Sequence, residues 1–417
     1  MGWQGVPINE KAGEANTMIV LFRILALSLG SFAVGTGAYV VAGVLVDIAE
    51  DLSVPVATTG LLVTIFALTF AIASPVLVAA TSGVARRRLI IGALILFALA
   101  NAAAALVPTF SLLLLVRVFA ALGAAVFTPV ASAFAASLAS PGMRGRALSV
   151  RLIGTTVAFL VGVPVGTVIS GYYGWRMSFI LVAALAAVAA LGARALLPDV
   201  EASADGTFLS HLSIVRRGAV VGVLGLTVLA LMASFVVLTY VRPLLESLTG
   251  FGTEGIGLML AIFGLASIPG TLLGGYAADR WGYRLTMTVM LAVLSASLLS
   301  FSLLFAVEAG SILVILATVV TLVAWSIATF AQFPLQQYHL IGVAPQEQSS
   351  VLSLNASAIQ AGQGMGAGFG ALILHYGSVA SLGWGGALCT LVALVVLGYG
   401  RSISPLQTPH EKRREPH

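Results

Sequence analysis

Residues 110–138 read FSLLLLVRVFAALGAAVFTPVASAFAASL, and Arg117 is the one charged residue among them. A helix that crosses a membrane needs about 20 mostly apolar residues. We count twelve such stretches, at 20–46, 56–81, 88–107, 110–138, 147–171, 177–196, 219–244, 255–278, 285–306, 311–335, 349–375 and 379–400. They are too long and too uniformly apolar for barrel strands, which alternate in polarity. The pattern predicts an all-α integral membrane protein with twelve transmembrane helices.

The composition of the 417 residues excludes other classes. Charged residues make up 8% and hydrophobic residues 59%, whereas soluble domains usually carry about 25% charged residues. A soluble enzyme, a nucleic-acid binder and a disordered scaffold are therefore excluded. Cys389 is the single cysteine and the five histidines are scattered, so we expect no metal site and no cofactor. The chain has no GxxxxGKS sequence, which argues against an ATP-driven pump.

The basic residues predict the orientation. If residue 1 is cytoplasmic, the inner loops and tails hold 17 of the 20 Lys and Arg residues. The outer loops then hold only Arg176 and Arg242, and Arg117 lies inside a stretch. Positive charge collects on the cytoplasmic side of membrane proteins. We therefore expect a multi-pass protein of the cytoplasmic (inner) membrane, with both termini in the cytoplasm.

The chain divides into two similar halves. Ile65-Phe66-Ala67-Leu68 recurs as Ile262-Phe263-Gly264-Leu265, and the same offset of 197 brings Arg87 onto Arg284. Parallel repeats are a transporter architecture, with the substrate site between the halves near the membrane midplane. We expect an N-terminal extension at 1–18, six-helix bundles at 19–197 and 219–400 around a central cavity, a cytoplasmic linker at 198–218 and a cytoplasmic tail at 401–417.

The loop after the eighth stretch carries a motif. Residues 275–284 read GYAADRWGYR, which resembles the cytoplasmic motif Gly-x-x-x-Asp-Arg-x-Gly-x-Arg of the major facilitator superfamily. The predicted gate residues in it are Asp279, Arg280, Gly282 and Arg284. Gly282 would permit the tight turn. The first half departs from the motif, because Ser82, Gly83 and Ala85 stand where Asp, Arg and Gly are expected.

Two more patterns extend the resemblance over residues 19–400. Arg117 and Gly123 are similar to an Arg-x-x-x-x-x-Gly pattern of proton-coupled members. The fifth stretch resembles the family's antiporter motif at Gly162, Pro164 and Gly166. The chain thus looks like the twelve-helix drug- and sugar-efflux branch of the superfamily. The resemblance implies alternating access around a central cavity.

Arg117 and two acids are the candidates for proton coupling. A charge at helix depth costs about 2.5–3.5 kcal/mol on insertion scales, so it needs a partner or a function. We expect Arg117 to be a buried cation with Asp47 as its partner; the alternative is snorkelling to the outer interface. Asp47 ranks first as proton carrier, with a solvated loop acid as its alternative. Glu246 ranks second, because no buried arginine of its own is expected.

The candidate cavity residues are amides, hydroxyls and aromatics. Thr329, Gln332 and Gln336 follow i+3/i+4 spacing and share one helix face. Amides at membrane depth bridge helices or contact solute, and both roles stay open for Asn355. Aromatics at helix ends also form interface belts. The predicted cavity residues are Tyr39, Tyr240, Trp325, Thr329, Gln332, Gln336, Asn355 and Gln360.

Small residues form stripes on the fifth and eighth stretches, and such stripes let helices approach closely. The fifth-stretch stripe is Gly154, Ala158, Gly162, Gly166 and Ser170, and the matching eighth-stretch stripe is Gly270, Gly274 and Ala278. Pro164 adds a hinge or kink. In the family that the chain resembles, this pair of helices seals one side of the cavity.

These observations predict a secondary transporter and not an enzyme. We expect export of a small organic solute (a drug, a sugar or a metabolite) in exchange for protons. An uncoupled facilitator or importer of the same fold is the first alternative, and a multipass enzyme or receptor is the second. The expected partners are the solute, protons and membrane lipid, with no nucleic acid, and the expected state is a monomer.

Overall fold

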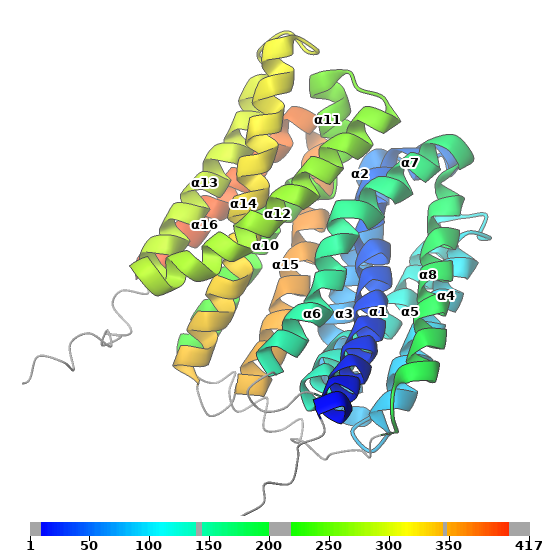
Figure 1. Ribbon diagram of the computed structural model, residues 1–417. Helices are drawn as coiled ribbons and strands as arrows, with labels where there is room; N and C mark the ends of the chain where they lie inside the picture. Colours follow the sequence, from blue (N-terminus) through cyan, green and yellow to red (C-terminus); the bar gives the residue numbers. More distant parts are fainter. Residues whose placement is uncertain (1–9, 139–143, 200–217, 345–347, 400–417) are drawn as a thin grey trace, which may run out of the picture. The chain divides into compact units, whose positions relative to one another are not determined.

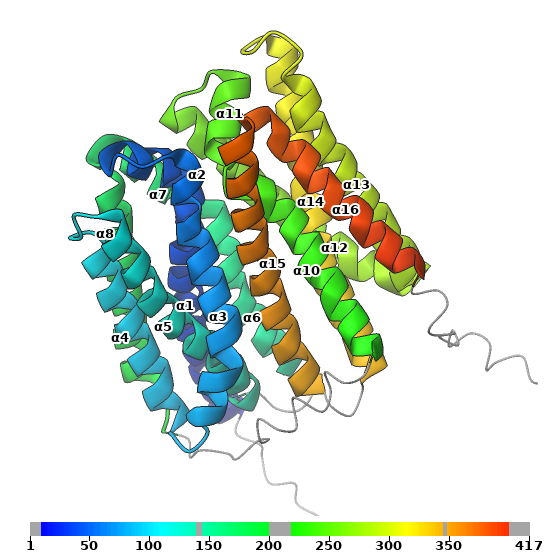
Figure 2. The ribbon, with the colours of Figure 1, turned by 180° about the vertical axis from the view of Figure 1, so that it is seen from behind.

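The computed structural model describes residues 10–138, 144–199, 218–344 and 348–399. Every regular element in these ranges is a helix (Figures 1 and 2). Before the linker they are α1 (Glu10–Asp51), α2 (Val56–Thr59), α3 (Leu61–Ala80), α4 (Arg86–Ala104), α5 (Phe110–Leu138), α6 (Arg144–Val157), a π-helical segment (Ala158–Gly162), α7 (Val163–Tyr173) and α8 (Trp175–Leu196).

The second half has the same all-helical character. Its elements are α10 (Gly218–Leu238), α11 (Val241–Thr249), α12 (Thr253–Trp281), α13 (Tyr283–Leu304), α14 (Ile312–Val343), α15 (Gln348–Tyr376), a 3₁₀ turn (Val379–Ser381) and α16 (Leu382–Tyr399). Each of the twelve predicted stretches overlaps a helix. The all-α membrane fold is therefore confirmed.

One predicted span differs from the others in composition. In the described part of the chain, eleven helices are long and apolar enough to cross a membrane. The twelfth, α15, has 29 residues, which at 1.5 Å per residue gives about 44 Å and exceeds the thickness of the apolar layer. Its amides Asn355, Gln360 and Gln363 lower its hydropathy. This helix thus has the length of a span, while its composition suits contact with other helices.

The seventh predicted stretch, 219–244, is two helices rather than one. α10 ends at Leu238, and α11 begins at Val241 after a turn. At this turn, the side chain of Tyr240 is fully buried and its hydroxyl donates to the carbonyl of Ala367 at 3.1 Å. Consequently Arg242 and Glu246 lie on a separate short helix.

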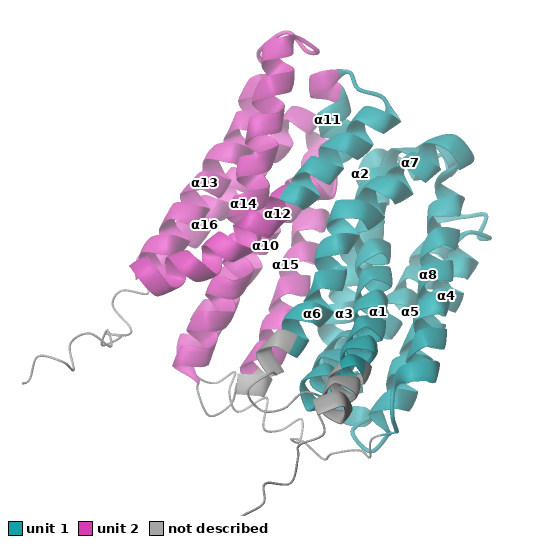
Figure 3. Ribbon diagram, in the orientation of Figure 1, with its two compact units in different colours: residues 1–205, 241–246, 250–265 teal, residues 206–240, 247–249, 266–417 magenta. Residues whose placement is uncertain are grey.

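The chain forms two compact units (Figure 3). The first comprises residues 1–205, 241–246 and 250–265, and the second comprises 206–240, 247–249 and 266–417. In the first, α1 packs against α6, α7 and α8, while α4 packs against α5 and α8. In the second, α10 packs against α15 and α16, and α13 packs against α14 and α16.

The compact units do not coincide with the predicted bundles 19–197 and 219–400. Two short segments of α11 and α12 group with the first unit. Most of the predicted linker, the start of the predicted extension and the tail lie outside the described residues. The six-helix division stays a prediction.

The fifth stretch departs from regular α-helix where a kink was predicted. Residues 158–162 form a π-helical segment directly before Pro164. Proline has no N–H, so it cannot donate to the carbonyl four residues earlier. π-Helical turns and prolines are the usual causes of a break in a helix. The helix is therefore irregular beside Pro164, and the predicted hinge or kink at Pro164 stays a prediction.

The small residues of the fifth stretch allow this stretch to pack closely against α1. A Cβ on Gly154 would lie 2.0 Å from the carbonyl oxygen of Ser28, and one on Gly166 would lie 2.4 Å from Val40. A methyl group cannot be accommodated at such distances without movement. The absence of side chains at these positions therefore lets α6 and α7 lie directly on α1.

The predicted stripe of the eighth stretch packs on a different neighbour, α14. A Cβ on Gly270 would lie 2.8 Å from the carbonyl oxygen of Ile327, and one on Gly274 would lie 2.1 Å from that of Ala331. The part of α12 that packs against the fifth stretch is Gly264, whose Cβ would lie 2.5 Å from the carbonyl of Phe159. The stripe of the fifth stretch thus contacts α1, and the stripe of the eighth stretch contacts α14.

Candidate functional site

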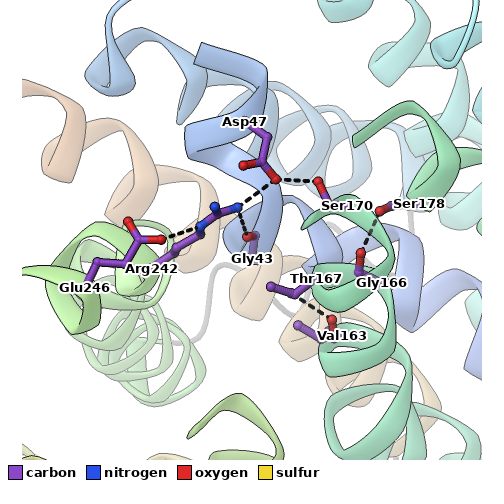
Figure 4. Close-up of polar contacts among 9 residues, drawn as sticks. All are labelled: Gly43, Asp47, Val163, Gly166, Thr167, Ser170, Ser178, Arg242 and Glu246. Atoms are coloured by element: carbon purple, nitrogen blue, oxygen red, sulfur yellow. Dashed lines mark hydrogen bonds and ion pairs between the residues drawn. The ribbon is translucent and has the colours of Figure 1, made fainter. Parts of the chain in front are cut away.

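Asp47, Arg242 and Glu246 form a charged cluster in the first unit (Figure 4). Arg242 Nη1 lies 2.7 Å from Asp47 Oδ2, and Arg242 Nε lies 2.8 Å from Glu246 Oε1. The side chain of Arg242 is 7% exposed, against 21% for Asp47 and 31% for Glu246. One buried cation is therefore shared by two acids from different helices.

Two helix geometries bring these groups together. Arg242 and Glu246 are spaced i,i+4 on α11, so their side chains lie on one face. Asp47 lies one turn before the end of α1, and Gly43, one turn earlier, offers its carbonyl to Arg242 Nη1 at 3.0 Å. Arg242 thus binds α1 through both a carboxylate and a backbone carbonyl.

α7 supports the acid from the other side. Ser170 donates a hydrogen bond to Asp47 Oδ2. Thr167 lies against Gly43, where a Cβ would be 1.9 Å from its hydroxyl oxygen. The same glycine therefore accepts Arg242 through its carbonyl and leaves room for Thr167 through its missing side chain.

The cluster has access to water. A pocket of about 550 Å³ is lined in part by Asp47, Ser170 and Thr253. Among the neighbouring acids, Glu50 is exposed and Asp51 pairs with Arg176. The alternative prediction of a loop acid is wrong, because Asp47 lies within α1 and pairs with Arg242.

Arg117 does not pair with Asp47, contrary to the prediction. Its Nη1 donates to the carbonyl of Gly37 at 2.9 Å, its Nε lies 3.5 Å from the carbonyl of Leu62, and its guanidinium lies 4.3 Å from the ring centre of Phe66. Gly37 and Asp47 are ten residues apart on α1, or about 15 Å. The two groups are therefore too distant to meet.

Arg117 is nevertheless the buried cation that the sequence predicts. Its side chain is 1% exposed, so the alternative prediction that it snorkels to the interface is wrong. Its Nη2 has no hydrogen-bond partner among the described residues. The second residue of its pattern, Gly123, allows contact with α4, because a Cβ there would lie 2.8 Å from the carbonyl of Ala93.

The residue that sequence reasoning missed is Arg242. It was assigned to an outer loop, and Glu246 was expected to lack a buried arginine. The i,i+4 spacing of Arg242 and Glu246 was the available signal, since opposite charges at this spacing pair on helices. That signal was hidden because the break after Leu238 was not predicted.

The predicted cavity residues fall in both units. Tyr39 is in the first, with its ring 4.2 Å from that of Phe159. The second unit holds Tyr240, Trp325, Thr329, Gln332, Gln336, Asn355 and Gln360. Within it, Thr329 contacts Ser234, and Asn355 contacts Thr227. Sequence reasoning missed these two α10 hydroxyls, although their seven-residue spacing in an apolar helix places both on one face.

The loop that carries the motif and the corresponding loop of the first half differ in their contacts. In the second half, Gly282 adopts a φ of 78° between α12 and α13, which confirms the predicted tight turn. Arg280 Nη1 donates to the hydroxyl of Tyr276 at 3.0 Å. In the first half, Arg87 pairs with Asp199 at 2.7 Å. A gate role for Asp279, Arg280 and Arg284 stays a prediction.

Comparison with known proteins identifies the family. A sequence profile of the Major Facilitator Superfamily matches residues 27–348 and 223–416. YbcL of Bacillus subtilis (strain 168), described as an uncharacterized MFS-type transporter, is 33% identical over 374 residues, which are 90% of this chain and 94% of that protein. YdhP of Escherichia coli (strain K12), described as an inner membrane transport protein, is 29% identical over 381 residues, which are 91% and 94% of the two chains.

Solved structures agree on the fold. The nucleoside transporter NupG gives a TM-score of 0.72 at 13% identity, covering 91% of this chain and 99% of its own. A bacterial homologue of the human lysosomal transporter Spinster gives 0.69 at 18% identity, covering 91% and 94%. The chain belongs to the major facilitator superfamily. It is a multi-pass membrane transporter that works by alternating access.

Proposed function

We propose that this protein exports a small organic solute in exchange for protons, and that Asp47 and Glu246 carry the protons. The supporting observation is the cluster in which both acids share the buried Arg242 (Figure 4). An acid that loads and releases protons needs both water and a charge partner that responds to protonation. Asp47 has both, because it lines a pocket and binds Arg242.

The charge of the cluster explains the coupling. With both acids ionised, the cluster carries a net charge of −1, and one added proton makes it neutral. Two opposite charges 4 Å apart attract by about 4 kcal/mol at an effective dielectric constant of 20. Protonation of Asp47 removes this attraction between α1 and α11. Proton loading would thereby free the two helices to separate in one half of the transport cycle.

The membrane placement is part of the same proposal. The excess of Lys and Arg in the inner loops supports a cytoplasmic (inner) membrane location with both termini in the cytoplasm. The description of YdhP as an inner membrane protein also supports it. The proposed working unit is a monomer.

A facilitator or importer without ion coupling is the second candidate. It is favoured by the positions of the described acids, which lie at helix ends or in connecting turns and not at mid-span. The two candidates differ in one measurable property, since only the proton-coupled exporter accumulates solute against its gradient when a pH gradient is imposed.

The test uses the full-length protein in proteoliposomes. Accumulation of radiolabelled solutes of several classes is measured with and without a pH gradient, for the wild type and Asp47→Asn. We expect Asp47→Asn to reduce gradient-driven accumulation about 100-fold, because loss of a buried charge interaction costs about 3 kcal/mol. Downhill exchange should continue, since it requires no proton release.

Two further variants complete the test. Glu50→Gln is the matched control, because Glu50 is an exposed acid on the same helix, and it should leave accumulation unchanged. If Glu246→Gln abolishes accumulation while Asp47→Asn does not, the proton carrier is Glu246. If the pH gradient changes solute accumulation in none of the three proteins (wild type, Asp47→Asn and Glu246→Gln), the facilitator hypothesis is correct.

A further inference from the structure

A surface rich in arginine, which we call the basic surface, lies at the end of the first unit where α8 ends. Arg23 Nε, on α1, donates to the carbonyl of Leu196 at 3.2 Å. Arg87 Nη2, on α4, donates to the carbonyl of Arg194 at 2.6 Å. Arginines from the two helices that pack against α8 thus bind its last turn, and these contacts gather the basic residues of α1, α4 and α8 at one place.

The basic surface carries a strong excess of positive charge. Its described charged side chains are Arg23, Arg86, Arg87, Arg88, Arg194 and Asp199. Five positive charges and one negative charge give this set a net charge of +4. Asp199 is already bound to Arg87 at 2.7 Å. Ser82, which stands where the family motif has an Asp, adds no negative charge. The departure of this loop from the motif therefore leaves the surface basic.

Two of the arginines have hydrogen-bond donors to spare. Arg194 is exposed, and its side chain has no hydrogen-bond or ion-pair partner among the described residues. Arg23 binds Leu196 through Nε, and its Nη1 and Nη2 have no partner in the described part of the chain. Guanidinium groups bind phosphate through paired N–H donors, and phosphate is recognised by arginine more often than by chance. The two side chains are therefore suited to an anion that lies outside the protein.

The basic surface borders exposed apolar side chains. On α8, Val188, Leu191 and Arg194 follow one another at intervals of three residues, so they share a face. Val188 and Leu191 are both more than half exposed, at 55% and 65%. On α1, Phe22 and Leu25 are also exposed. Large exposed apolar faces mark contact with a membrane or a partner. Positive charge and apolar surface thus meet at the end of two membrane-spanning helices.

We propose that the basic surface binds an anionic phospholipid, with the phosphate at Arg23 and Arg194 and the acyl chains on the apolar faces of α1 and α8. Charge complementarity selects this occupant, because anionic headgroups attract Lys and Arg at the ends of membrane helices. The ammonium group of phosphatidylethanolamine would find no free carboxylate among the described residues, since Asp199 is bound to Arg87. The inference goes beyond the proposed transport function and does not depend on it.

The experiment is native mass spectrometry of the purified full-length protein in detergent, titrated with phosphatidylglycerol or with phosphatidylethanolamine. We expect phosphatidylglycerol to bind more tightly. One arginine near an anionic headgroup accounts for about a fivefold change in affinity. Arg194→Gln should therefore weaken phosphatidylglycerol binding about fivefold, and Arg23→Gln with Arg194→Gln about 25-fold.

Control variants separate lipid binding from structure. Arg176→Gln removes an arginine from the opposite end of α8 and should bind phosphatidylglycerol as the wild type does. Arg194→Lys keeps the positive charge and should retain most of the affinity. Arg194→Gln should leave the Tm of the lipid-free protein unchanged, because the side chain has no partner among the described residues. If Arg194 served the structure of α8 alone, that Tm would fall while the preference for phosphatidylglycerol stayed the same.

The other outcomes also decide the matter. The proposal is rejected if phosphatidylethanolamine binds as tightly as phosphatidylglycerol, or if Arg194→Gln retains full affinity. An equal loss in Arg176→Gln would show an effect of total charge and not of this surface. Inorganic phosphate is the last probe. Displacement of phosphatidylglycerol by an equal concentration of inorganic phosphate would identify a site for soluble anions and reject the lipid assignment.

Discussion

The two compact units differ in the charges that they bury. In the described residues, every charged side chain that is fully buried belongs to the first unit: Arg117, Arg151 and Arg242. Among the described residues, hydroxyls are buried in both units, and four of the five buried amides lie in the second: Gln332, Gln336, Asn355 and Gln363. Under the proposed function, the charged cluster of the first unit responds to protonation, and the neutral amides of the second unit do not.

The largest expected effect comes from removing the cation of the charged cluster. Arg242→Leu leaves Asp47 and Glu246 mostly buried without their partner, which costs about 3–5 kcal/mol in comparable sites. We expect proton-driven transport to fall at least about 100-fold and the Tm to fall as well. Transport is measured in proteoliposomes and the Tm on the purified protein.

A triple variant separates these two effects. Asp47→Asn, Arg242→Leu and Glu246→Gln together remove every charge of the cluster, so the Tm should recover while transport stays lost. Recovery of proton-driven transport in the triple variant would contradict the division between the units, because the cluster would then be a structural element alone.

Arg117 provides the second test, since it is a buried cation without a carboxylate partner among the described residues. Arg117→Leu removes a costly buried charge, and we expect the Tm to be equal or higher. Transport should fall about tenfold, equivalent to about 1.4 kcal/mol, if the charge is retained for function. Thermal unfolding and solute accumulation measure the two quantities. A lower Tm with normal transport would show that Arg117 serves packing alone.

The third test addresses close packing in the second unit, with neighbouring glycines of α12 as a matched pair. A Cβ on Gly274 would lie 2.1 Å from the carbonyl oxygen of Ala331, whereas one on Gly275 would have no atom within 4 Å. Gly274→Ala should destabilise the protein by about 1–3 kcal/mol through overpacking. Gly275→Ala should be neutral or stabilise the helix by up to about 1 kcal/mol. The Tm of each purified variant is compared with wild type, and equal effects would contradict the close α12–α14 contact.

The sequence predicts the fold well for a physical reason. Apolar runs of about 20 residues have few alternatives to a membrane helix, because backbone groups in lipid must be hydrogen-bonded within the chain. Each predicted stretch accordingly overlaps a helix. The break after Leu238 escaped prediction because Thr239 and Tyr240 interrupt no apolar pattern. A local signal was nevertheless present, because Pro243 has no N–H to donate to the carbonyl of Thr239. The hydroxyl of Tyr240 also donates to the carbonyl of Ala367 at this break.

The candidate site was predicted in part. Asp47, Glu246 and Arg117 were recognised because charges are rare in apolar sequence. Their partners were assigned incorrectly, because pairing depends on which helices are neighbours and on which residues of those helices face each other. Asp47 pairs with Arg242, which is 195 residues away in the chain. The spacing of residues within one helix cannot predict a contact between residues so far apart.

The smallest expected effect distinguishes the motif loop of the second half from the corresponding loop of the first half. Arg87, in the loop that departs from the family motif, pairs with Asp199, whose side chain is 71% exposed. Exposed ion pairs contribute about 0–1 kcal/mol and are screened by salt. Arg87→Gln should therefore lower the stability by less than about 1 kcal/mol at low ionic strength, with less effect at high ionic strength. Arg88→Gln, at an exposed neighbouring position, serves as the control. Both variants should transport at the wild-type rate, because the intact motif lies in the other half. A tenfold loss of transport in Arg87→Gln alone would instead show that the first-half loop acts as a gate despite its missing motif residues.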